Sequence, residues 1–456
     1  MVSESRDNER TSDSIAMAEP RNRCSTDLDR RTLLRAFAQG AAAGVAGLGV
    51  FGRRAVAQEG TLQALIQQSP RADFDSGFES ATRIVPMPNP SLPTLSPATV
   101  QATEQAIGRY EAILARGGWP NVQPVDRVRF AMRHPSVADL RRCLVAVGDL
   151  EVTAIDDVYD SYVESAVRRF QARHGLTVDG IVHEQTLRLL NVPAAVRISQ
   201  LKTNLARLRG FGGGLGNRFV VCNIPAAQIE AVENDRVVSR YTAVVGKPDR
   251  PSPDIQTKII EVNFNPYWTA PVSIVRRDLI PKMQAEPDYL SKNRIHIFDP
   301  HGRELPAQQI NWYSEGAANY RFKQDPGDFN SLGSIRINFP NSHEVYMHDT
   351  PFKNLFGEDF RFHSSGCVRV QNVGELVNWL LAATPGWSRA EIDRVLRTGE
   401  RKDARLTPPV PLHWVYVTAW ATADGIVQFR EDIYNRDGLG AYATRADPVV
   451  LPVGIR

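Results

Sequence analysis

The sequence predicts an α+β protein in which a small helical unit precedes a sandwich-like domain of antiparallel strands. In residues 134–192, apolar side chains recur at the i, i+3, i+4, i+7 spacing of amphipathic helices. From Asn217 onward, short apolar runs are bounded by Gly, Pro and Asn turns, a pattern typical of an antiparallel sheet or sandwich. Helical spacing returns within this strand region over a stretch too long for an ordinary loop, which predicts an inserted helical lid.

The composition is that of an ordinary soluble globular chain. Its 456 residues predict two or three domains, and its 42% hydrophobic and 23% charged residues are unremarkable. The formal net charge is +3, and no block of basic residues is interleaved with aromatics. The sequence therefore argues against a nucleic-acid partner.

Residues 1–57 resemble a twin-arginine (Tat-type) export signal. Arg30 and Arg31 precede the uncharged run Ala36–Phe51, and the small residues Ala55–Ala57 follow as a cleavage pattern. The alternative is a basic tail without structure. The uncharged run is short for a membrane span, and no later stretch reaches the roughly 18 apolar residues that a spanning helix needs. We therefore expect export by the Tat route to the periplasm or cell envelope, with no stable membrane span after signal cleavage.

Composition and periodicity predict the order of the domains along the chain. We expect the signal peptide at 1–57, a linker and N-terminal scaffold at 58–133, the three-helix unit at 134–192, a helix and Gly-rich hinge at 193–217, the strand domain at 218–400 with its lid at about 273–328, and C-terminal strands that complete this domain at 401–456.

Individual elements follow from the same periodicities. The helices expected in the helical unit are Ser136–Val147, Tyr162–Phe170 and Glu184–Leu190. The strands expected are Arg218–Asn223, Gln228–Glu233, Arg236–Val245, Ile259–Asn263, Ser334–Phe339 and His343–Met347, with a late hairpin of His413–Trp420 and Ile426–Phe429 that we expect to complete the sheet.

The four cysteines differ in their sequence surroundings. Cys24 lies in the leader, while Cys143 and Cys222 lie in apolar helical and strand contexts that indicate buried small hydrophobes. Cys367 follows a Ser-Ser-Gly turn, so it is the best candidate for an accessible thiol.

A histidine, a cysteine and an arginine close together indicate nucleophilic catalysis on an acyl group. His348 can accept the thiol proton of Cys367, and the backbone carbonyl of Asp349 can hold the other ring nitrogen. Backbone amides at Gly366 can point at a developing oxyanion. Arg369 shares strand parity with Cys367, so it can hold a substrate carboxylate or favour the thiolate; the alternative is a structural ion pair.

At these residues the sequence resembles the L,D-transpeptidase catalytic domain, whose signature is a His followed by a Ser-x-Gly-Cys turn. Here His348 precedes Ser364–Cys367. Further similar segments are Val244–Pro248, Phe264–Trp268, Pro326–Gly327, Asn330–Gly333, Phe339–Asn341 and His348–Pro351, which resemble the lid-containing branch of that family. Many members have a second His where this chain has Ser365, so His348 is expected to be the base, with His363 as its rival.

Residues 134–192 resemble the peptidoglycan-binding-domain family, a small three-helix module. The resemblance rests on Ala166–Gln171, His174–Val182 and Leu189–Asn191. It implies peptidoglycan glycan or stem peptide as a partner. The alternative is a helical unit that only packs on its neighbours.

The resemblance implies a cysteine-dependent enzyme that forms 3→3 peptidoglycan crosslinks through a thioester, with stem peptides as substrates and no cofactor. Cys367 is the expected nucleophile. Alternatives are an L,D-carboxypeptidase, an enzyme that attaches proteins to the wall, and a non-catalytic wall-binding scaffold. No His-Glu-x-x-His or Cys-x-x-Cys motif is present, so the sequence predicts no metal and disfavours a zinc hydrolase.

Four residues are candidates for substrate binding. They are Arg369, Tyr267, Trp268 and Asn341. The aromatic pair has the alternative role of core or cleft wall, and Asn341 has the alternative role of closing a turn.

Overall fold

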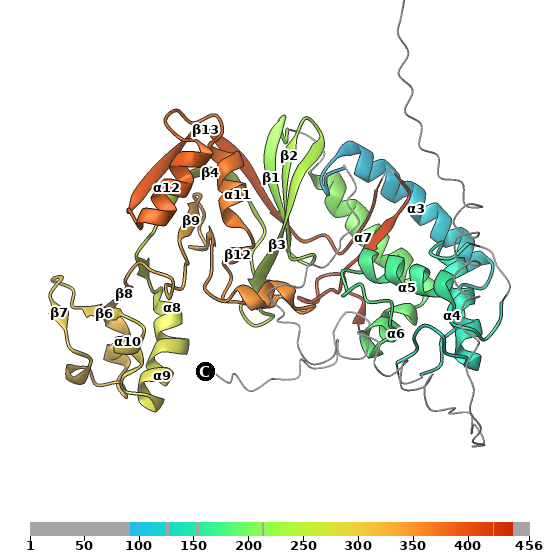
Figure 1. Cartoon of the computed structure of the whole chain (residues 1–456), viewed down its shortest axis with the longest axis horizontal. Coiled ribbons are helices and arrows are strands. Elements are labelled where there is room, and N and C mark those ends of the chain that lie inside the picture. The colour runs from blue at the N-terminus through green and yellow to red at the C-terminus, as the bar shows by residue number, and fades with distance from the viewer. Residues whose placement is uncertain (1–91, 125–126, 152–154, 212–213, 423, 441–456) are drawn as a thin grey trace, which may run out of the picture. The chain divides into compact units, whose positions relative to one another are not determined.

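The structure is a computed structural model that describes residues 92–124, 127–151, 155–211, 214–422 and 424–440 (Figure 1). The export signal expected at 1–57 and the first part of the expected linker and scaffold, residues 58–91, lie outside the described residues. Within the part described, no helix is both long and apolar enough to cross a membrane.

Helices dominate the first part of the described chain. The helices are α3 (Pro97–Ala115), α4 (Pro135–Ala146), α5 (Ser161–Arg173), α6 (Glu184–Leu190), α7 (Ala194–Gly210), α8 (Val272–Ile274), α9 (Ile280–Ala285), α10 (Tyr289–Lys292), α11 (Val373–Leu381) and α12 (Arg389–Thr398), with the π-helix η2 (Val275–Leu279) and the 3-10 helices η3 (Ala307–Gln309), η4 (Glu315–Asn319) and η5 (Lys353–Gly357).

Strands dominate the later part. They are β1 (Arg218–Asn223), β2 (Gln228–Glu233), β3 (Arg236–Gly246), β4 (Ile255–Phe264), β5 (Trp268–Thr269), β6 (Ile295–Phe298), β7 (Glu304–Leu305), β8 (Arg321–Gln324), β9 (Ile335–Asn338), β10 (Met347–His348), β11 (Phe362–Ser364), β12 (Val368–Val370), β13 (Lys402–Val415), β14 (Ala419–Ala421) and β15 (Val427–Phe429).

Helices α4, α5 and α6 form the small unit that the periodicity predicted. The side chain of Asp160 caps α5 by accepting from Val163 N–H at 2.9 Å. Its core is closed by fully buried Tyr159, whose hydroxyl donates to the carbonyl of Gly180 at 2.7 Å. Cys143 is 1% exposed in this core, which confirms the prediction that it is a buried hydrophobe.

The main sheet closes on itself. Its strand order is β11-β3-β12-β10-β9-β4-β13-β1-β2. The last strand, β2, also pairs with β3, so the strands from β3 to β2 form a closed ring and β11 lies outside it. Most pairs are antiparallel, as expected, but β1–β13, β10–β12 and β11–β3 are parallel. The α+β prediction of a β-rich domain beside a helical unit is confirmed.

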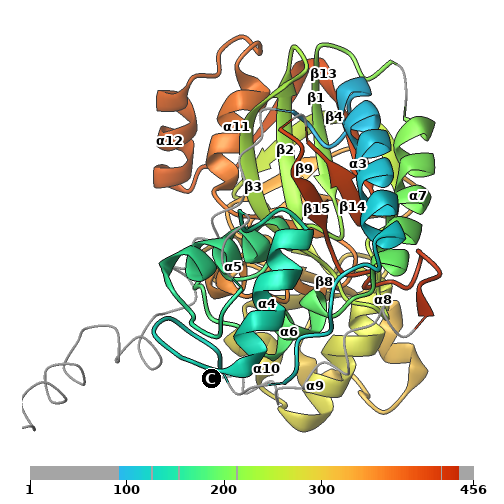
Figure 2. The same cartoon turned by 90° about the vertical axis from the view of Figure 1, so that its right-hand side faces the viewer.

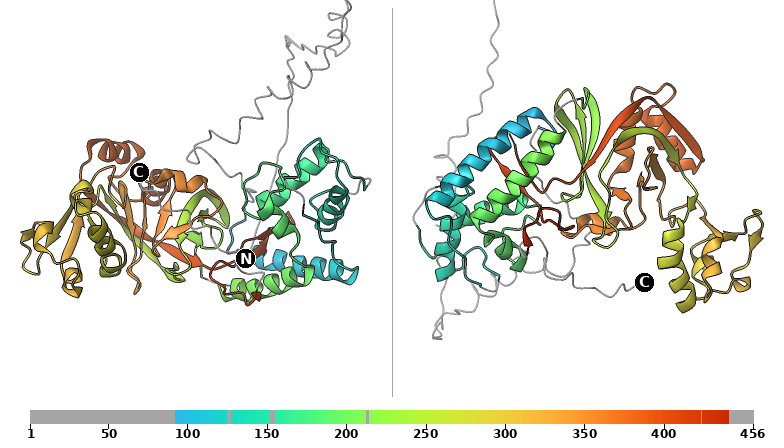
Figure 3. Two further views of the ribbon diagram at one scale, coloured as in Figure 1. Left: turned by 90° about the horizontal axis from the view of Figure 1, so that it is seen from below. Right: turned by 180° about the vertical axis from the view of Figure 1, so that it is seen from behind.

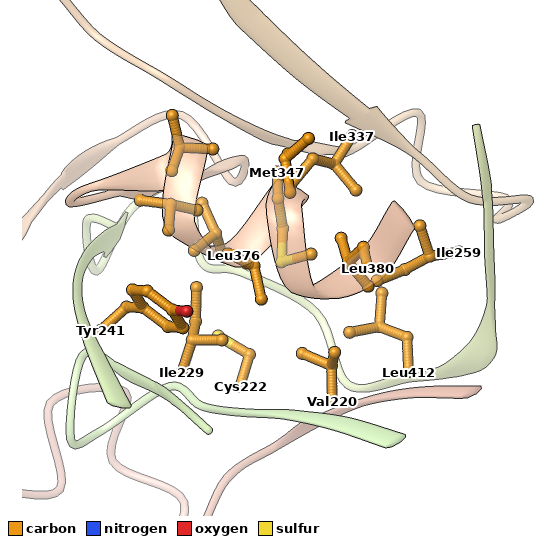
Figure 4. Packing of buried hydrophobic residues seen from close by; sticks show 14 of the residues in the cluster. Val220, Cys222, Ile229, Tyr241, Ile259, Ile337, Met347, Leu376, Leu380 and Leu412 are labelled. Carbon is orange, nitrogen blue, oxygen red and sulfur yellow. The ribbon is translucent and has the colours of Figure 1, made fainter. Parts of the chain in front are cut away.

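The interior of this sheet is one apolar core. Figure 4 shows Leu376 and Leu380 of α11 converging with Met347 of β10 and Val220 and Cys222 of β1. Cys222 is 0% exposed, as predicted for a buried hydrophobe. The core therefore fixes β10, and with it the residues next to Met347, from the inside.

The insertion expected at about 273–328 is present as a mixed element and not as a purely helical one. It contains a four-stranded sheet, β5-β8-β6-β7, beside α8, η2, α9 and α10 (Figure 3). Buried and half-buried residues alternate along β6, which is the period of a strand with one covered face. The insertion has its own core, in which Phe322 and Met283 are buried.

The late hairpin completes the sheet only in part. Strand β13 lies between β4 and β1 as expected, but β14 and β15 form a separate two-stranded sheet against α3 and α7 (Figure 2). Backbone pairing between β1 and β13 ends at Asn223 and Val415. Beyond it, the Asn223 side chain accepts from Val417 N–H at 3.1 Å and donates to the Val417 carbonyl at 3.0 Å. Phe429 then packs in the core shared with α3 and α7.

Candidate active site

Three adjacent strands carry the residues of the candidate site. Strand β10 runs parallel to β12 and antiparallel to β9. The register sets His348 of β10 opposite Arg369 of β12 on one side and Arg336 of β9 on the other. Because paired residues in neighbouring strands share a face of the sheet, these three side chains emerge in one row.

Cys367 lies on the same face as His348. It directly precedes β12, where Val368 N–H donates to the Tyr346 carbonyl at 3.1 Å. Met347 and Val368 are 0% exposed and belong to the core on the opposite face. Alternation therefore places Tyr346 and Cys367 on the same face as His348, where Cys367 is half-buried at the margin of the core.

Hydrogen bonds hold the turn before Cys367 in place. Gly366 has φ +114°, a conformation that favours glycine, and its carbonyl accepts from the Ser252 hydroxyl at 2.8 Å. Ser364 Oγ donates to the Cys367 carbonyl at 2.5 Å and accepts from Gly366 N–H at 3.1 Å. The Gly366 amide, which the sequence suggests for the oxyanion, is thus engaged by Ser364 in this structure. Its catalytic role stays a prediction.

His348 is 5% exposed and has a defined orientation. Its Nδ1 is hydrogen-bonded to the backbone carbonyl of Asp349, so Nδ1 carries the proton and Nε2 is left as the acceptor. The Asp349 carboxylate is held by the Ser334 amide at 3.2 Å and hydroxyl at 3.0 Å, and by Lys353. A carboxylate anchored in this way fixes the carbonyl that orients the imidazole.

Burial keeps both groups of the pair neutral. It lowers the pKa of His348 to about 3, an effect reinforced by the nearby cations Arg369 and Arg336 and opposed by the Asp349 hydrogen bond. Burial raises the pKa of Cys367 to about 11, although hydrogen bonding from Tyr346 and the two arginines lower it. The sequence suggests that Arg369 favours the thiolate; the arginine does act in that direction, but burial outweighs it.

Tyr346 is a site residue to which the sequence assigned no role. Its hydroxyl is hydrogen-bonded to the Cys367 thiol and to Trp268. Its ring lies 5.6 Å from the His348 ring and 4.4 Å from the Arg336 guanidinium. Tyr346 lies two residues before His348 and therefore on the same face of a strand, which is the sequence signal that could have identified it.

Comparison with known proteins fits this geometry. Residues 217–392 match the model of the L,D-transpeptidase catalytic domain, and residues 133–190 match the model described as "Putative peptidoglycan binding domain". Residues 217–392 are therefore similar to an L,D-transpeptidase catalytic domain.

The comparisons also found one curated relative and several solved structures that are similar to parts of this chain. The relative, named "Putative L,D-transpeptidase", is from Haemophilus influenzae and is 34% identical over 239 residues, which are 52% of this chain and 48% of the relative. The chain thus spans about half the length of this relative. An L,D-transpeptidase from Mycobacterium smegmatis is 13% identical with a TM-score of 0.22, over 44% of this chain and 58% of that one. One from Stackebrandtia nassauensis is 12% identical with a TM-score of 0.25, over 65% and 96%.

The two aromatic residues expected to bind substrate, Tyr267 and Trp268, lie in different surroundings. Trp268 is 7% exposed in the core of the insertion, and its hydrogen bond to Tyr346 makes it a support behind the thiol. The Tyr267 ring is half-buried between Lys323 at 3.7 Å and Arg401 at 4.6 Å. Neither contact reaches Cys367.

Asn341 is fully engaged within its own turn. Its amide nitrogen donates to the carbonyls of Phe339 at 3.0 Å and Val345 at 2.8 Å, and its oxygen accepts from the amides of His343 and Val345. These hydrogen bonds fit the alternative role of closing a turn, and the predicted substrate contact stays a prediction. The same turn explains why the strand expected from His343 begins only at Met347.

His363, the rival base, points its Nε2 at Glu358 and at the Phe360 carbonyl, both at 2.8 Å. Ser365 is exposed and accepts from Arg250 at 3.0 Å.

Arg250 also joins the turn before Cys367 to the insertion. It forms an ion pair with Asp278 of η2 at 2.6 Å.

Among the described residues, no three His, Cys, Asp or Glu side chains gather as potential metal ligands.

Proposed function

We propose that the protein is a cysteine-dependent L,D-transpeptidase that forms 3→3 peptidoglycan crosslinks through a thioester. The observation that carries this proposal is that the strand register places Cys367 and His348 on one face of neighbouring chain segments. The Asp349 carbonyl occupies Nδ1 of the imidazole, so Nε2 is available to accept the thiol proton.

In the first step the Cys367 sulfur attacks the carbonyl carbon of the third stem residue, and its proton passes to His348 Nε2. The C–S bond forms, the C–N bond to the terminal residue breaks, and His348 returns the proton to the departing amine. A neutral thiol and a neutral imidazole are the correct starting forms for this general-base route.

In the second step the side-chain amine of another stem attacks the thioester. The new C–N bond forms as the C–S bond breaks, and the amine proton passes through His348 to the leaving thiolate. Water in place of the amine gives a carboxypeptidase. The insertion, joined to the nucleophile turn through Arg250 and Asp278, is suited to exclude that water.

The second matched segment supports the choice of substrate. A peptidoglycan-binding module on the same chain raises the local concentration of stem peptides around the catalytic domain. We place the protein in the periplasm or cell envelope and assign its export to the Tat route, on the twin arginine at Arg30 and Arg31.

Intact-mass spectrometry tests the nucleophile. The full chain is incubated with a synthetic tetrapeptide donor, and we expect an adduct of the tripeptide acyl group that is absent from Cys367→Ala. The matched control Cys222→Ala removes a buried thiol and should retain the adduct. An adduct that persists in Cys367→Ala would refute the assignment. Muropeptide analysis then distinguishes the reactions, because crosslinked 3→3 dimers require transpeptidation whereas tripeptides alone mean hydrolysis.

A further inference from the structure

Two half-buried arginines beside His348 contact aromatic rings but bind no carboxylate among the described residues: Arg336 lies 4.4 Å from the Tyr346 ring and Arg369 lies 5.9 Å from the Phe352 ring. Arg336 and Arg369 lie directly opposite His348 on the two neighbouring strands. The Nε of each is buried without a hydrogen-bond partner. Neither side chain makes an ion pair or donates a hydrogen bond within the ranges that the structure describes.

Several other arginines of the described chain do have carboxylate or carbonyl partners. Arg173 binds Asp149 at 2.6 Å, and Arg141 binds Asp160 at 2.7 Å. Arg361 donates to the Glu358 carbonyl at 2.7 Å. Two half-buried cations in one row beside a candidate base, with no carboxylate bound to either among the described residues, form a site suited to an anion.

We propose that Arg336 and Arg369 form a receptor for the terminal carboxylate of the donor stem. This inference rests on the proposed function and names how that enzyme selects its donor. Guanidinium groups match carboxylates in shape and charge, and two of them facing the same row can hold one carboxylate from both sides.

The chemistry of the leaving group supports this position. In an amino acid the carboxylate and the amine nitrogen are attached to the same carbon. When Arg336 and Arg369 hold this carboxylate, the amine nitrogen of the departing amino acid lies next to the His348 imidazole, which must protonate it. Carboxylate binding also neutralises the two cations that disfavour a proton on His348, so an occupied receptor makes the imidazole a stronger base.

The receptor would reject donors that lack a free carboxylate at this position. A stem with one further residue, or with a terminal amide, presents a neutral group and leaves both cations unpaired. Sites built to bind a specific polar group discriminate strongly against ligands that lack it, so we expect a preference of at least about 100-fold.

Titration calorimetry on the full chain carrying Cys367→Ala tests the receptor without turnover. The probes are a synthetic tetrapeptide with a free terminal carboxylate and the same peptide with a terminal amide. We expect the acid to bind at least about 100-fold more tightly than the amide. Adding Arg336→Met or Arg369→Met should reduce that ratio to within about threefold, and Arg336→Lys should leave an intermediate ratio because a point charge replaces the fork.

Arg405→Gln is the matched control. It removes an exposed cation of β13, four strands from β12 on the same sheet, and should leave the ratio unchanged. Thermal unfolding provides a second readout: because neither arginine has an ion-pair partner within the described residues, its replacement by Met should not lower the melting temperature. Equal binding of acid and amide, no measurable binding of the acid, or a ratio unchanged in Arg336→Met overturns the proposal.

The outcome is separable from the proposed function. If the acid is preferred in Cys367→Ala but wild type forms no thioester, the receptor stands and the proposed function fails. If wild type forms the thioester equally well from both peptides, the proposed function stands and the receptor fails.

Discussion

Replacing His348 by Asn should remove an acid-sensitive part of the protein's stability. The ordinary pKa of histidine is about 6.5, whereas burial beside Arg369 and Arg336 lowers that of His348 to about 3. Between these two values the unfolded chain binds a proton at this position and the folded chain does not. Folding stability therefore falls as pH decreases through this window and is fully present above it.

The magnitude follows from the two pKa values. Each pH unit inside the window costs about 1.4 kcal/mol, so wild type should lose about 3 kcal/mol relative to His348→Asn between pH 7 and pH 4. Asparagine retains a side-chain donor for the Asp349 carbonyl but cannot accept a proton. All other titrating groups are common to both proteins, so their contributions cancel in the difference.

Urea unfolding followed by tryptophan fluorescence at pH 4, 5, 6 and 7 measures this difference. The control His343→Asn replaces an exposed histidine and shows the effect of removing a histidine outside the candidate site. If the difference between wild type and His348→Asn is constant with pH, then His348 is not a buried neutral base, and the reasoning on the catalytic pair fails with it.

Two further substitutions test how the pair is held. Gly333 has φ +57°, and a Cβ added there would lie 2.5 Å from the Asp349 carboxylate. Gly333→Ala should therefore lower the free energy of unfolding in urea by about 3 kcal/mol, because it strains the backbone and displaces the Asp349 carboxylate. Gly399→Ala, at φ +68° in open space, should cost only about 1 kcal/mol, and equal losses would refute the anchor. Tyr346→Phe removes a hydrogen bond that lowers the thiol pKa, so the pH midpoint of iodoacetamide alkylation should rise; an unchanged or lower midpoint would contradict that contact.

Local patterns predicted the parts of the fold that depend on nearby residues. Strands β1 and β2 occupy the residues that their alternation indicated, and α6 begins and ends where its spacing placed it. The pairing of β3 with β12 and β11, which closes the sheet, was not predictable, because these strands are distant in the sequence and periodicity does not encode contacts between distant strands. The four-stranded sheet of the insertion was missed for a related reason, since strands of two to four residues are too short to show a period.

The site divides in the same way. Cys367, His348 and Arg369 were found because they lie in or beside a recognisable turn, whereas Arg336 lies on a strand with no motif around it. Its place beside His348 follows only from the register of β9 against β10. This placement changes the interpretation of Arg369. If Arg369 is considered alone, a single cation beside the thiol suggests a role in favouring the thiolate form of Cys367. With Arg336 on the other side of the imidazole, the cations are arranged around the base and not around the nucleophile. That arrangement favours a role in holding an anion next to His348, since two cations serving only the thiol would gain more by flanking Cys367.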